Sequence, residues 1–208
     1  MTVVQARAWV EAIAAAIAEQ ADHLTQLDSA IGDADHGANL RRGFAAVLTA
    51  LAGPESPTVG DVLVKTGTTL VASVGGASGP LYGSVFRAIG KPLTSHAIDG
   101  NQLLAGLRDG LTAIQRLGAA VPGDKTMVDA YAPAVVAFER DLQAGGTLAS
   151  AAARAADAAE DGMRATISLQ ARKGRASYLG ARSIGHQDPG ATSTALVFRT
   201  LATVMAAS

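Results

Sequence analysis

The sequence predicts an all-α fold of eight antiparallel helices closed into a bundle or barrel, and three observations lead to this prediction. Apolar residues recur at intervals of three and four over most of the 208 residues, as they do on one face of an α-helix. No stretch sustains the apolar and polar alternation of a half-buried strand. Breaks rich in glycine, proline and polar residues separate eight helical segments, which is the organisation of an antiparallel bundle.

Apolar stripes predict the first three helices. Residues 3–27 and 40–51 each carry an apolar residue at about every third or fourth position. The run "GPESP" at residues 53–57 interrupts this pattern, and a third helix is expected over residues 59–71. Aromatic residues make up only 4% of the chain and alanine is abundant, a composition that suits helices approaching each other closely.

Proline position and a capping signal place the next two helices. A fourth helix is expected after Ser78, because Pro80 is tolerated in the first turn of a helix. Asp99 and Gln102 resemble a capping box, in which each side chain bonds the other's backbone N–H. The fifth helix is therefore expected to run from there to about Leu117.

The last three helices are predicted from similar signals. Thr126 and Asp129 offer a start for the sixth helix, in which Pro133 predicts a kink or a delayed start. The Ala-rich stretch over residues 147–170 is expected to form the seventh. The Asp-Pro pair at residues 188–189 makes a suitable N-cap and first-turn pair for the eighth.

The bulk composition fits one domain over residues 1–208 with a sizeable core, because 49% of the residues are hydrophobic and no linker is visible. Seventeen basic and eighteen acidic residues nearly cancel, so a surface for nucleic acid or an anionic membrane is not indicated. The absence of cysteine excludes disulfides and thiolate chemistry and fits a cytoplasmic location. Glu11 and Glu19 make the first helix too charged for a membrane span or a signal peptide.

The stretch "LDSAIGDADHG" at residues 27–37 brings three carboxylates close together in sequence, those of Asp28, Asp33 and Asp35. Carboxylates hold Mg²⁺ together with substrate phosphates, and the glycines here let the backbone turn tightly. Helix capping and turn stabilisation explain the same residues, and the spacing alone leaves both interpretations open. A calcium-binding EF-hand is excluded, because its twelfth position requires a glutamate and is Phe44 here.

His36 follows this cluster and is a candidate metal ligand, helix-start donor or base. No second histidine lies near enough in sequence to support a zinc site. We favour a contact from His36 to a phosphate or to a neighbouring aspartate, with Asn39 joining through its amide one helical turn later.

Two other segments complete a pattern that points to a nucleotide. The run "GGASG" at residues 75–79 opens a helix, where free N–H groups bind anions, although tight helix packing explains the same glycines. Four basic residues fall within eleven positions of the segment 171–190: Arg172, Lys173, Arg175 and Arg182. Such a cluster neutralises phosphate charge or simply keeps a loop solvated. Together with the acidic cluster, these segments indicate a nucleotide site.

Sequence motifs of other nucleotide sites and of covalent catalysis are absent. The chain contains neither the Walker A pattern nor the G-x-G-x-x-G pattern. The motifs G-x-S-x-G, H-E-x-x-H and S-x-x-K are also missing. Phosphoryl transfer remains compatible with this sequence, because it needs positioning and charge neutralisation rather than a protein nucleophile.

Four motifs, in this order, resemble the nucleotide-binding L subunit of dihydroxyacetone kinase over essentially the whole chain. They are "LDSAIGDADHGANLRRGF", "SVGGASGPLYG", "PGDKTM" and "ARKGRASYLGARSIGHQDPGATS". The resemblance implies an eight-helix antiparallel barrel with ADP or ATP bound at one end.

The resemblance also implies roles for single residues. Asp28, Asp33 and Asp35 match the aspartates that hold two Mg²⁺ ions against the nucleotide phosphates. Twelve positions match residues that contact the nucleotide: His36, Gly37, Ala38, Asn39, Ala77, Ser78, Gly118, Met127, Arg175, Asp188, Pro189 and Gly190. Gly118 and Met127 match positions near the adenine, and Arg175 with residues 188–190 matches a lid over the nucleotide. No catalytic side chain is separable from these metal and phosphate ligands.

In this family the acceptor, dihydroxyacetone, is held by a separate K subunit, so the resemblance implies an incomplete enzyme. A free-standing L subunit resembles the bacterial version, in which a phosphohistidine protein of the phosphotransferase system, the M-type subunit, rephosphorylates bound ADP in place. Two other interpretations stay open. One is an ATP-dependent L-type subunit for another acceptor, such as a tetrulose or a fatty acid, and the other is a non-enzymatic nucleotide-binding module that regulates a partner. A homodimer is left open.

Overall fold

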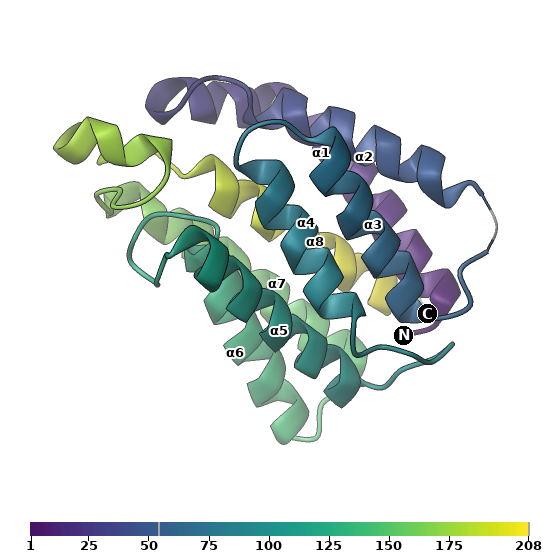
Figure 1. The fold of residues 1–208 in the computed structure, drawn as a ribbon. Helices are drawn as coiled ribbons and strands as arrows, with labels where there is room; N and C mark the ends of the chain where they lie inside the picture. The colour runs from purple at the N-terminus through teal and green to yellow at the C-terminus, as the bar shows by residue number, and fades with distance from the viewer. Residues whose placement is uncertain (54, 208) are drawn as a thin grey trace.

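The computed structural model describes residues 1–53 and 55–207, and in these residues it contains eight α-helices (Figure 1). The helices are α1 (Val3–Ile31), α2 (His36–Leu51), α3 (Val59–Ser73), α4 (Ser78–Gly90), α5 (Gly100–Gly118), α6 (Val128–Gln143), α7 (Leu148–Ala165) and α8 (Pro189–Ala206). Two 3₁₀ segments, η1 (Thr166–Ser168) and η2 (Arg175–Ser183), lie between α7 and α8. The described residues form no strand beyond one isolated bridge between Thr2 and Ala97. The predicted all-α class is confirmed.

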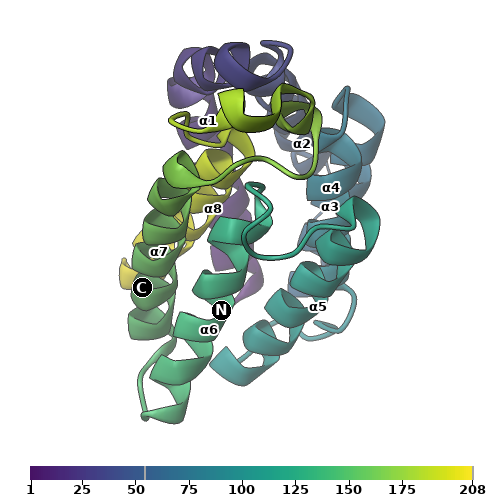
Figure 2. The ribbon, with the colours of Figure 1, turned by 90° about the vertical axis from the view of Figure 1, so that its left-hand side faces the viewer.

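The helices form a closed ring. Each packs against the next one in sequence, and α8 also packs against α1, so the last helix closes the ring on the first (Figures 1 and 2). Both termini lie at the end of the ring away from η2, which lies beside the C-terminal end of α1. The N-terminal ammonium group of Met1 donates a hydrogen bond to the carbonyl of Ile98 there, at 2.7 Å. The predicted antiparallel barrel of eight helices is therefore present.

Local capping explains where several helices begin. Asp99 and Gln102 form the expected capping box, with N–H to side-chain oxygen distances of 2.8 and 2.9 Å. Thr2, Thr58 and Thr147 start α1, α3 and α7 with similar boxes. Such a box satisfies N–H groups that have no partner within the helix. The starts of α1, α3, α5 and α7 are thus encoded within a few residues each.

Two kinds of packing fill the inside of the ring. Trp9 packs against Phe86 with a ring-centroid distance of 5.9 Å, and its indole N–H donates to the carbonyl of Val197 at 3.0 Å. On α7 the inner face consists of fully buried alanines: Ala151, Ala152, Ala155, Ala156 and Ala159. Their small side chains let α7 approach α6 and α8 closely, as the composition suggests.

Glycines bring α3 and α4 into backbone contact. A Cβ atom on Gly67 would lie 2.5 Å from the carbonyl oxygen of Gly83 and 2.7 Å from the backbone nitrogen of Arg87. Gly60 and Gly90 face each other in the same way where α3 begins and α4 ends. At both points the gap between the helices is too small for any side chain.

Two helix ends differ from the prediction, and tertiary contacts explain both. α1 runs to Ile31 instead of ending at residue 27, because Ile31 is buried against the segment before α8. α7 ends at Ala165 rather than near residue 170, because the carbonyl of Thr166 accepts from a lysine elsewhere in the chain. α6 begins at Val128, beside Thr126 and Asp129 as predicted, and Pro133 lies inside the helix without delaying this start.

The break predicted over residues 53–57 falls between α2 and α3. Gly53 and residues 55–57 lie outside both helices. Pro54, which belongs to the same prediction, lies outside the described residues.

The contact between α3 and α4 gives a stability test. We expect Gly67→Ala to lower the free energy of unfolding by about 1–2 kcal/mol, because overpacking costs more than the helix propensity gained from alanine. Gly118→Ala is the matched control, since the nearest atom to a Cβ there lies 3.7 Å away. Urea unfolding of both variants measures the difference. Equal unfolding free energies for the two variants would contradict the proposed close contact.

Candidate functional site

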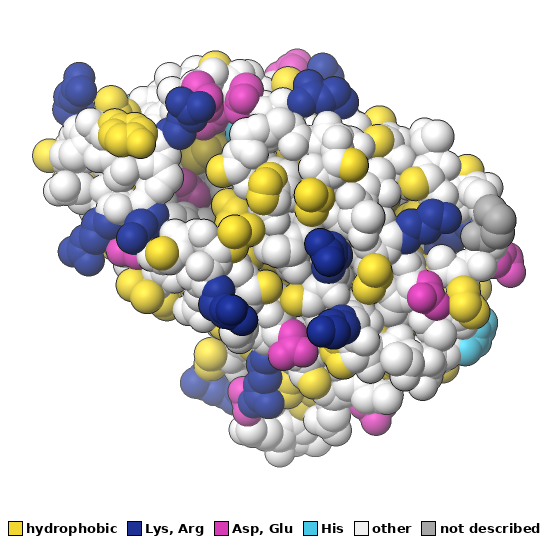
Figure 3. Space-filling view, in the orientation of Figure 1, with side chains coloured by type: hydrophobic (Ala, Val, Ile, Leu, Met, Phe, Trp, Pro, Cys, Tyr) yellow, Lys and Arg dark blue, Asp and Glu magenta, His cyan; other side chains and the backbone are white. Residues whose placement is uncertain are grey.

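A cavity of about 440 Å³ lies at the end of the ring where η2 is found. Its volume is within the range of small-molecule sites. Figure 3 shows the molecule hollowed at this end, with acidic and apolar side chains inside the hollow. The wall comes from the end of α1, the start of α2 and α4, the end of α5, the segment before α6, η2 and the start of α8. The three connections that the sequence singled out therefore meet at one place.

The structure brings most of the predicted site residues to this cavity. The lining includes Asp28, Asp33, Asp35, His36, Ala77, Ser78, Gly118, Met127, Arg175, Asp188, Pro189 and Gly190. Gly37, Ala38 and Asn39 do not line it. Gly37 packs against the backbone of α1, Ala38 is exposed, and the Asn39 amide oxygen accepts from Arg42 at 2.8 Å.

Three carboxylates converge at one end of the cavity. One oxygen each of Asp28, Asp33 and Asp35 lies within 4.8 Å of the others. Asp28 is buried in the last turn of α1, and its Oδ2 accepts the N–H of Asp35 at 2.9 Å and the N–H of His36 at 3.2 Å. The loop reverses at Ala34, whose φ of 60° is left-handed. A set of three oxygen donors fits Mg²⁺, a hard cation that prefers oxygen ligands.

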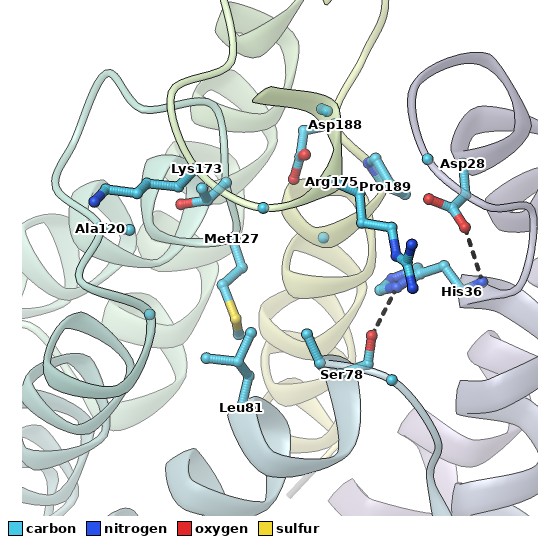
Figure 4. Close-up of a pocket in the computed structure, with 18 of the residues that line it drawn as sticks. Asp28, His36, Ser78, Leu81, Ala120, Met127, Lys173, Arg175, Asp188 and Pro189 are labelled. Carbon is cyan, nitrogen blue, oxygen red and sulfur yellow. Dashed lines mark hydrogen bonds between the residues drawn. The ribbon is translucent and has the colours of Figure 1, made fainter. Parts of the chain in front are cut away.

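His36 contacts hydroxyl groups rather than a neighbouring aspartate. Its Nδ1 lies 3.0 Å from Ser78 Oγ, and its Nε2 lies 2.9 Å from Ser193 Oγ (Figure 4). Burial lowers the pKa of His36, against the opposing effect of Asp28 and Asp35, so the imidazole is neutral at pH 7. Both ring nitrogens thus have hydroxyl partners, and one of these, the Ser78 hydroxyl, lies at the cavity wall.

A buried hydroxyl network continues from His36 into the core. The Tyr82 hydroxyl lies 2.6 Å from Ser193 Oγ and 3.0 Å from Thr194 Oγ1. Burial raises the pKa of Tyr82 to about 12, so the phenol stays protonated. No role was predicted from the sequence for Tyr82 or Ser193. Tyr82 lies within the quoted motif at residues 73–83, but only the packing of α4 on α8 shows its partners.

The segment at the start of α4 is closely packed and also lines the cavity. A Cβ on Gly79 would strike the carbonyl of Val74, so the turn is closely packed. Gly76, Ala77 and Ser78 nevertheless line the cavity at the N-terminus of α4. Backbone N–H groups there favour an anion, because the helix dipole is positive at this end.

The opposite end of the cavity is apolar. Figure 4 shows the side chains of Leu81 and Met127 pointing toward one another in this part of the wall. Ile114, Leu117 and Ala120 complete this part of the wall. The cavity therefore has a charged end and an apolar end, as an amphipathic ligand with a flat ring and an anionic tail requires.

Residues 169–187 include η2, and residues 173–176 of this segment line one side of the cavity; we call the segment the lid. Ala171, Ala176 and Leu179 pack on Ile31 at the end of α1. Arg175 Nε binds Asp33 Oδ2 at 2.8 Å, and both side chains are well exposed to solvent. Of the four basic residues in this segment, Lys173 and Arg175 line the cavity, whereas Arg172 and Arg182 do not.

Lys125 and Asp188 border the cavity beneath the lid. Lys125 is 1% exposed, and burial lowers its pKa although Asp188 and Asp129 act in the opposite direction. Asp188 caps α8 by accepting the N–H of Ala191 at 2.7 Å. Burial raises the pKa of Asp188 to about 7 despite this bond. No role was predicted for Lys125, although it lies in the quoted motif "PGDKTM".

A family model described as the DAK2 domain matches residues 30–203, which is most of the chain and includes the whole cavity wall except Asp28. The chain belongs to the DAK2 domain family. The resemblance seen in the sequence is thereby confirmed at the level of the family. In the described residues of this DAK2 domain, no helix is long and apolar enough to cross a membrane.

Two curated relatives and one solved structure show how far the similarity of this DAK2 domain extends. It is 43% identical over 195 residues, 93% of each chain, to the ADP-binding subunit DhaL of the PEP-dependent dihydroxyacetone kinase of Escherichia coli (strain K12). It is 42% identical over 198 residues, 95% of each chain, to the ADP-binding subunit DhaL of the PTS-dependent dihydroxyacetone kinase of Lactococcus lactis subsp. lactis (strain IL1403). The crystal structure of the dihydroxyacetone kinase from C. freundii in complex with AMP-PNP and Mg²⁺ superposes with a TM-score of 0.73 at 27% identity. That match covers 98% of this chain and 34% of the larger one.

The buried carboxyl of Asp188 predicts a pH dependence of stability. Its pKa is 3.8 in the unfolded chain and about 7 in the folded one, so the folded state binds more protons between these values. The free energy of unfolding should therefore fall as the pH rises from 4 to 7. Asp188→Asn keeps an N-cap side chain and removes this ionisation.

We expect Asp188→Asn to gain stability over the wild type as the pH rises, by about 1.4 kcal/mol for each unit of pKa shift. Urea unfolding at several pH values between 4 and 8 measures the difference between the two proteins. His36 is present in both, so its own titration cancels. A difference that stays constant over this range would contradict the raised pKa.

Proposed function

We propose that this chain is the nucleotide-binding subunit of a dihydroxyacetone kinase. In this proposal it holds ADP or ATP with two Mg²⁺ ions and passes a phosphoryl group to dihydroxyacetone on a separate K subunit. A phosphohistidine protein of the phosphotransferase system then rephosphorylates the ADP in place. The observation that carries the proposal is the convergence of Asp28, Asp33 and Asp35 at the charged end of the cavity.

The polar groups around the cavity suit a diphosphate or triphosphate. The three aspartates would hold the cations, and the N-terminus of α4 offers N–H groups next to Ser78. Arg175 extends from the lid toward the same end (Figure 4). When bound, Mg²⁺ neutralises the negative charge that phosphate oxygens carry during transfer.

The remaining residues bind, orient and exclude water. The apolar end between Leu81 and Met127 accepts a flat base such as adenine. The neutral His36 holds the Ser78 hydroxyl in a fixed direction without adding positive charge. The lid covers the cavity and keeps solvent from the transferring group. These tasks need geometry and charge rather than a covalent nucleophile.

The identity of the acceptor and of the phosphoryl donor rests on the relatives. The two DhaL proteins align along almost their whole length, and each is named as one subunit of a PEP-dependent or PTS-dependent dihydroxyacetone kinase. A subunit of this kind needs a K partner for the acceptor and a phosphoprotein for the donor. A cytoplasmic location stays a prediction from the composition.

Native mass spectrometry of the purified, gel-filtered protein tests the function directly. We expect the mass of one ADP with two Mg²⁺ ions to remain on the chain, because a nucleotide that serves as a cofactor should not be lost on purification. Addition of EDTA should release it. An empty chain that turns over free ATP with a K subunit would point to an ATP-dependent kinase instead. A chain that binds nucleotide but supports no transfer with K and M subunits would point to a regulatory module.

The aspartates give a second test. We expect Asp33→Ala and Asp35→Ala each to abolish Mg²⁺-dependent ADP binding, measured by isothermal titration calorimetry. The helical fold should persist, because the Asp33 to Arg175 ion pair is exposed and such pairs add little stability. Asp22→Ala, an exposed aspartate on the same α1 helix, is the matched control. An unchanged ADP affinity in either site variant would contradict the metal assignment.

A further inference from the structure

We infer that Lys125 is a positioning residue that fastens both ends of the lid to the cavity wall and thereby sets how slowly the bound nucleotide leaves. The inference rests on the proposed function for its kinetic consequence, although the anchoring itself does not. It goes beyond that function because it assigns nucleotide retention to a residue outside the metal and phosphate ligands.

The ammonium group of Lys125 joins two points that flank the lid in sequence. Its Nζ donates to the carbonyl of Thr166 at 2.5 Å and to the carbonyl of His186. Thr166 lies just before the lid, and His186 lies at its end. Because one charged group bonds both carbonyls, the two ends of the lid are held at one fixed separation.

Backbone contacts beside Lys125 reinforce this attachment. The N–H of Arg172, early in the lid, donates to the carbonyl of Asp124 at 3.0 Å. The N–H of Gly185 donates to the carbonyl of Ile167 at 2.8 Å, which joins the two ends directly. The base of the lid is therefore a small network with residues 124 and 125 at its centre.

Lys125 is held in place by its own loop. Its φ of 62° is left-handed, a conformation that costs energy for a residue with a side chain. The carboxylate of Asp129 accepts the N–H of Gly123 at 2.5 Å and the N–H of Thr126 at 2.7 Å, and these bonds fix the turn on both sides. A strained backbone fixed in this way is consistent with a side chain that must point in one direction.

The same residue borders the cavity. Lys125 lies two positions before Met127, which forms part of the apolar end, and it is buried at 1% exposure. A bound nucleotide would have to displace the lid to leave by that side. Loss of the ammonium group would leave the carbonyl of His186 without this bond, and the lid would open more often.

Nucleotide release is the decisive measurement. The dissociation rate of a fluorescent ADP analogue, chased with excess ADP in the presence of Mg²⁺, is compared for the wild type, Lys125→Met and Lys125→Arg. We expect Lys125→Met to raise the dissociation rate about tenfold or more, since bonds from a charged donor are strong, and to leave the association rate nearly unchanged. Lys125→Arg keeps the donors and should restore slow release at least in part. Lys91→Met, at an exposed lysine distant from the lid, is the matched control.

Limited proteolysis tests the anchoring without nucleotide. Trypsin cleaves after Arg172, Lys173, Arg175 and Arg182 in the lid, and we expect these cuts to be faster in nucleotide-free Lys125→Met while cuts elsewhere keep their rates. If Lys125→Met does not fold, Lys125→Gln replaces it in both assays with the same expected direction. The inference would be overturned if Lys125→Met released nucleotide and was cleaved in the lid at the same rates as the wild type. Equal acceleration of cuts along the whole chain would overturn it too. If Lys125→Met is cleaved faster in the lid but the wild-type protein binds no ADP, the anchoring role of Lys125 stands and the proposed function is wrong.

Discussion

The carboxylate of Asp28 is the group on which the geometry of the site depends. It lies in the last turn of α1 and accepts the N–H groups of Asp35 and His36, so the chain must turn back and begin α2 against the end of α1. This reversal places three carboxylates together, and their mutual repulsion favours a bound cation. Arg175 reaches one of them from the lid. The acidic loop, the start of α2 and the lid thus share one electrostatic centre.

A neutral hydrogen-bonded network stands next to this charged centre. His36, Ser193 and Tyr82 come from α2, α8 and α4, and each is buried where a charge would be costly. Burial keeps both the imidazole and the phenol neutral, so the network fixes the orientation of its side chains without adding charge. It presents the Ser78 hydroxyl to the cavity. In the proposed function, charge neutralisation would come from cations held by the aspartates and from basic residues of the lid, a division of tasks suited to phosphoryl transfer.

Much of the fold was predictable because its signals are local. The capping box of Asp99 and Gln102 lies within one helical turn, and apolar stripes mark the inner face of each helix. The predicted ends of α1 and α7 were wrong, and contacts with residues distant in sequence explain both differences. α1 gained a turn because Ile31 packs under the lid, and α7 lost one where Lys125 binds the carbonyl of Thr166.

The sequence by itself determined the helices, their order, the acidic cluster and the family resemblance, because each depends on residues close together in the chain. Only the tertiary structure decided that Tyr82 and Lys125 belong to the site and that residues 37–39 do not line its cavity. The bond from His36 to Ser193 joins residues 157 positions apart, and that from Lys125 to Thr166 joins residues 41 apart. Such partners are set by how eight helices close into a ring, and no local pattern records that arrangement.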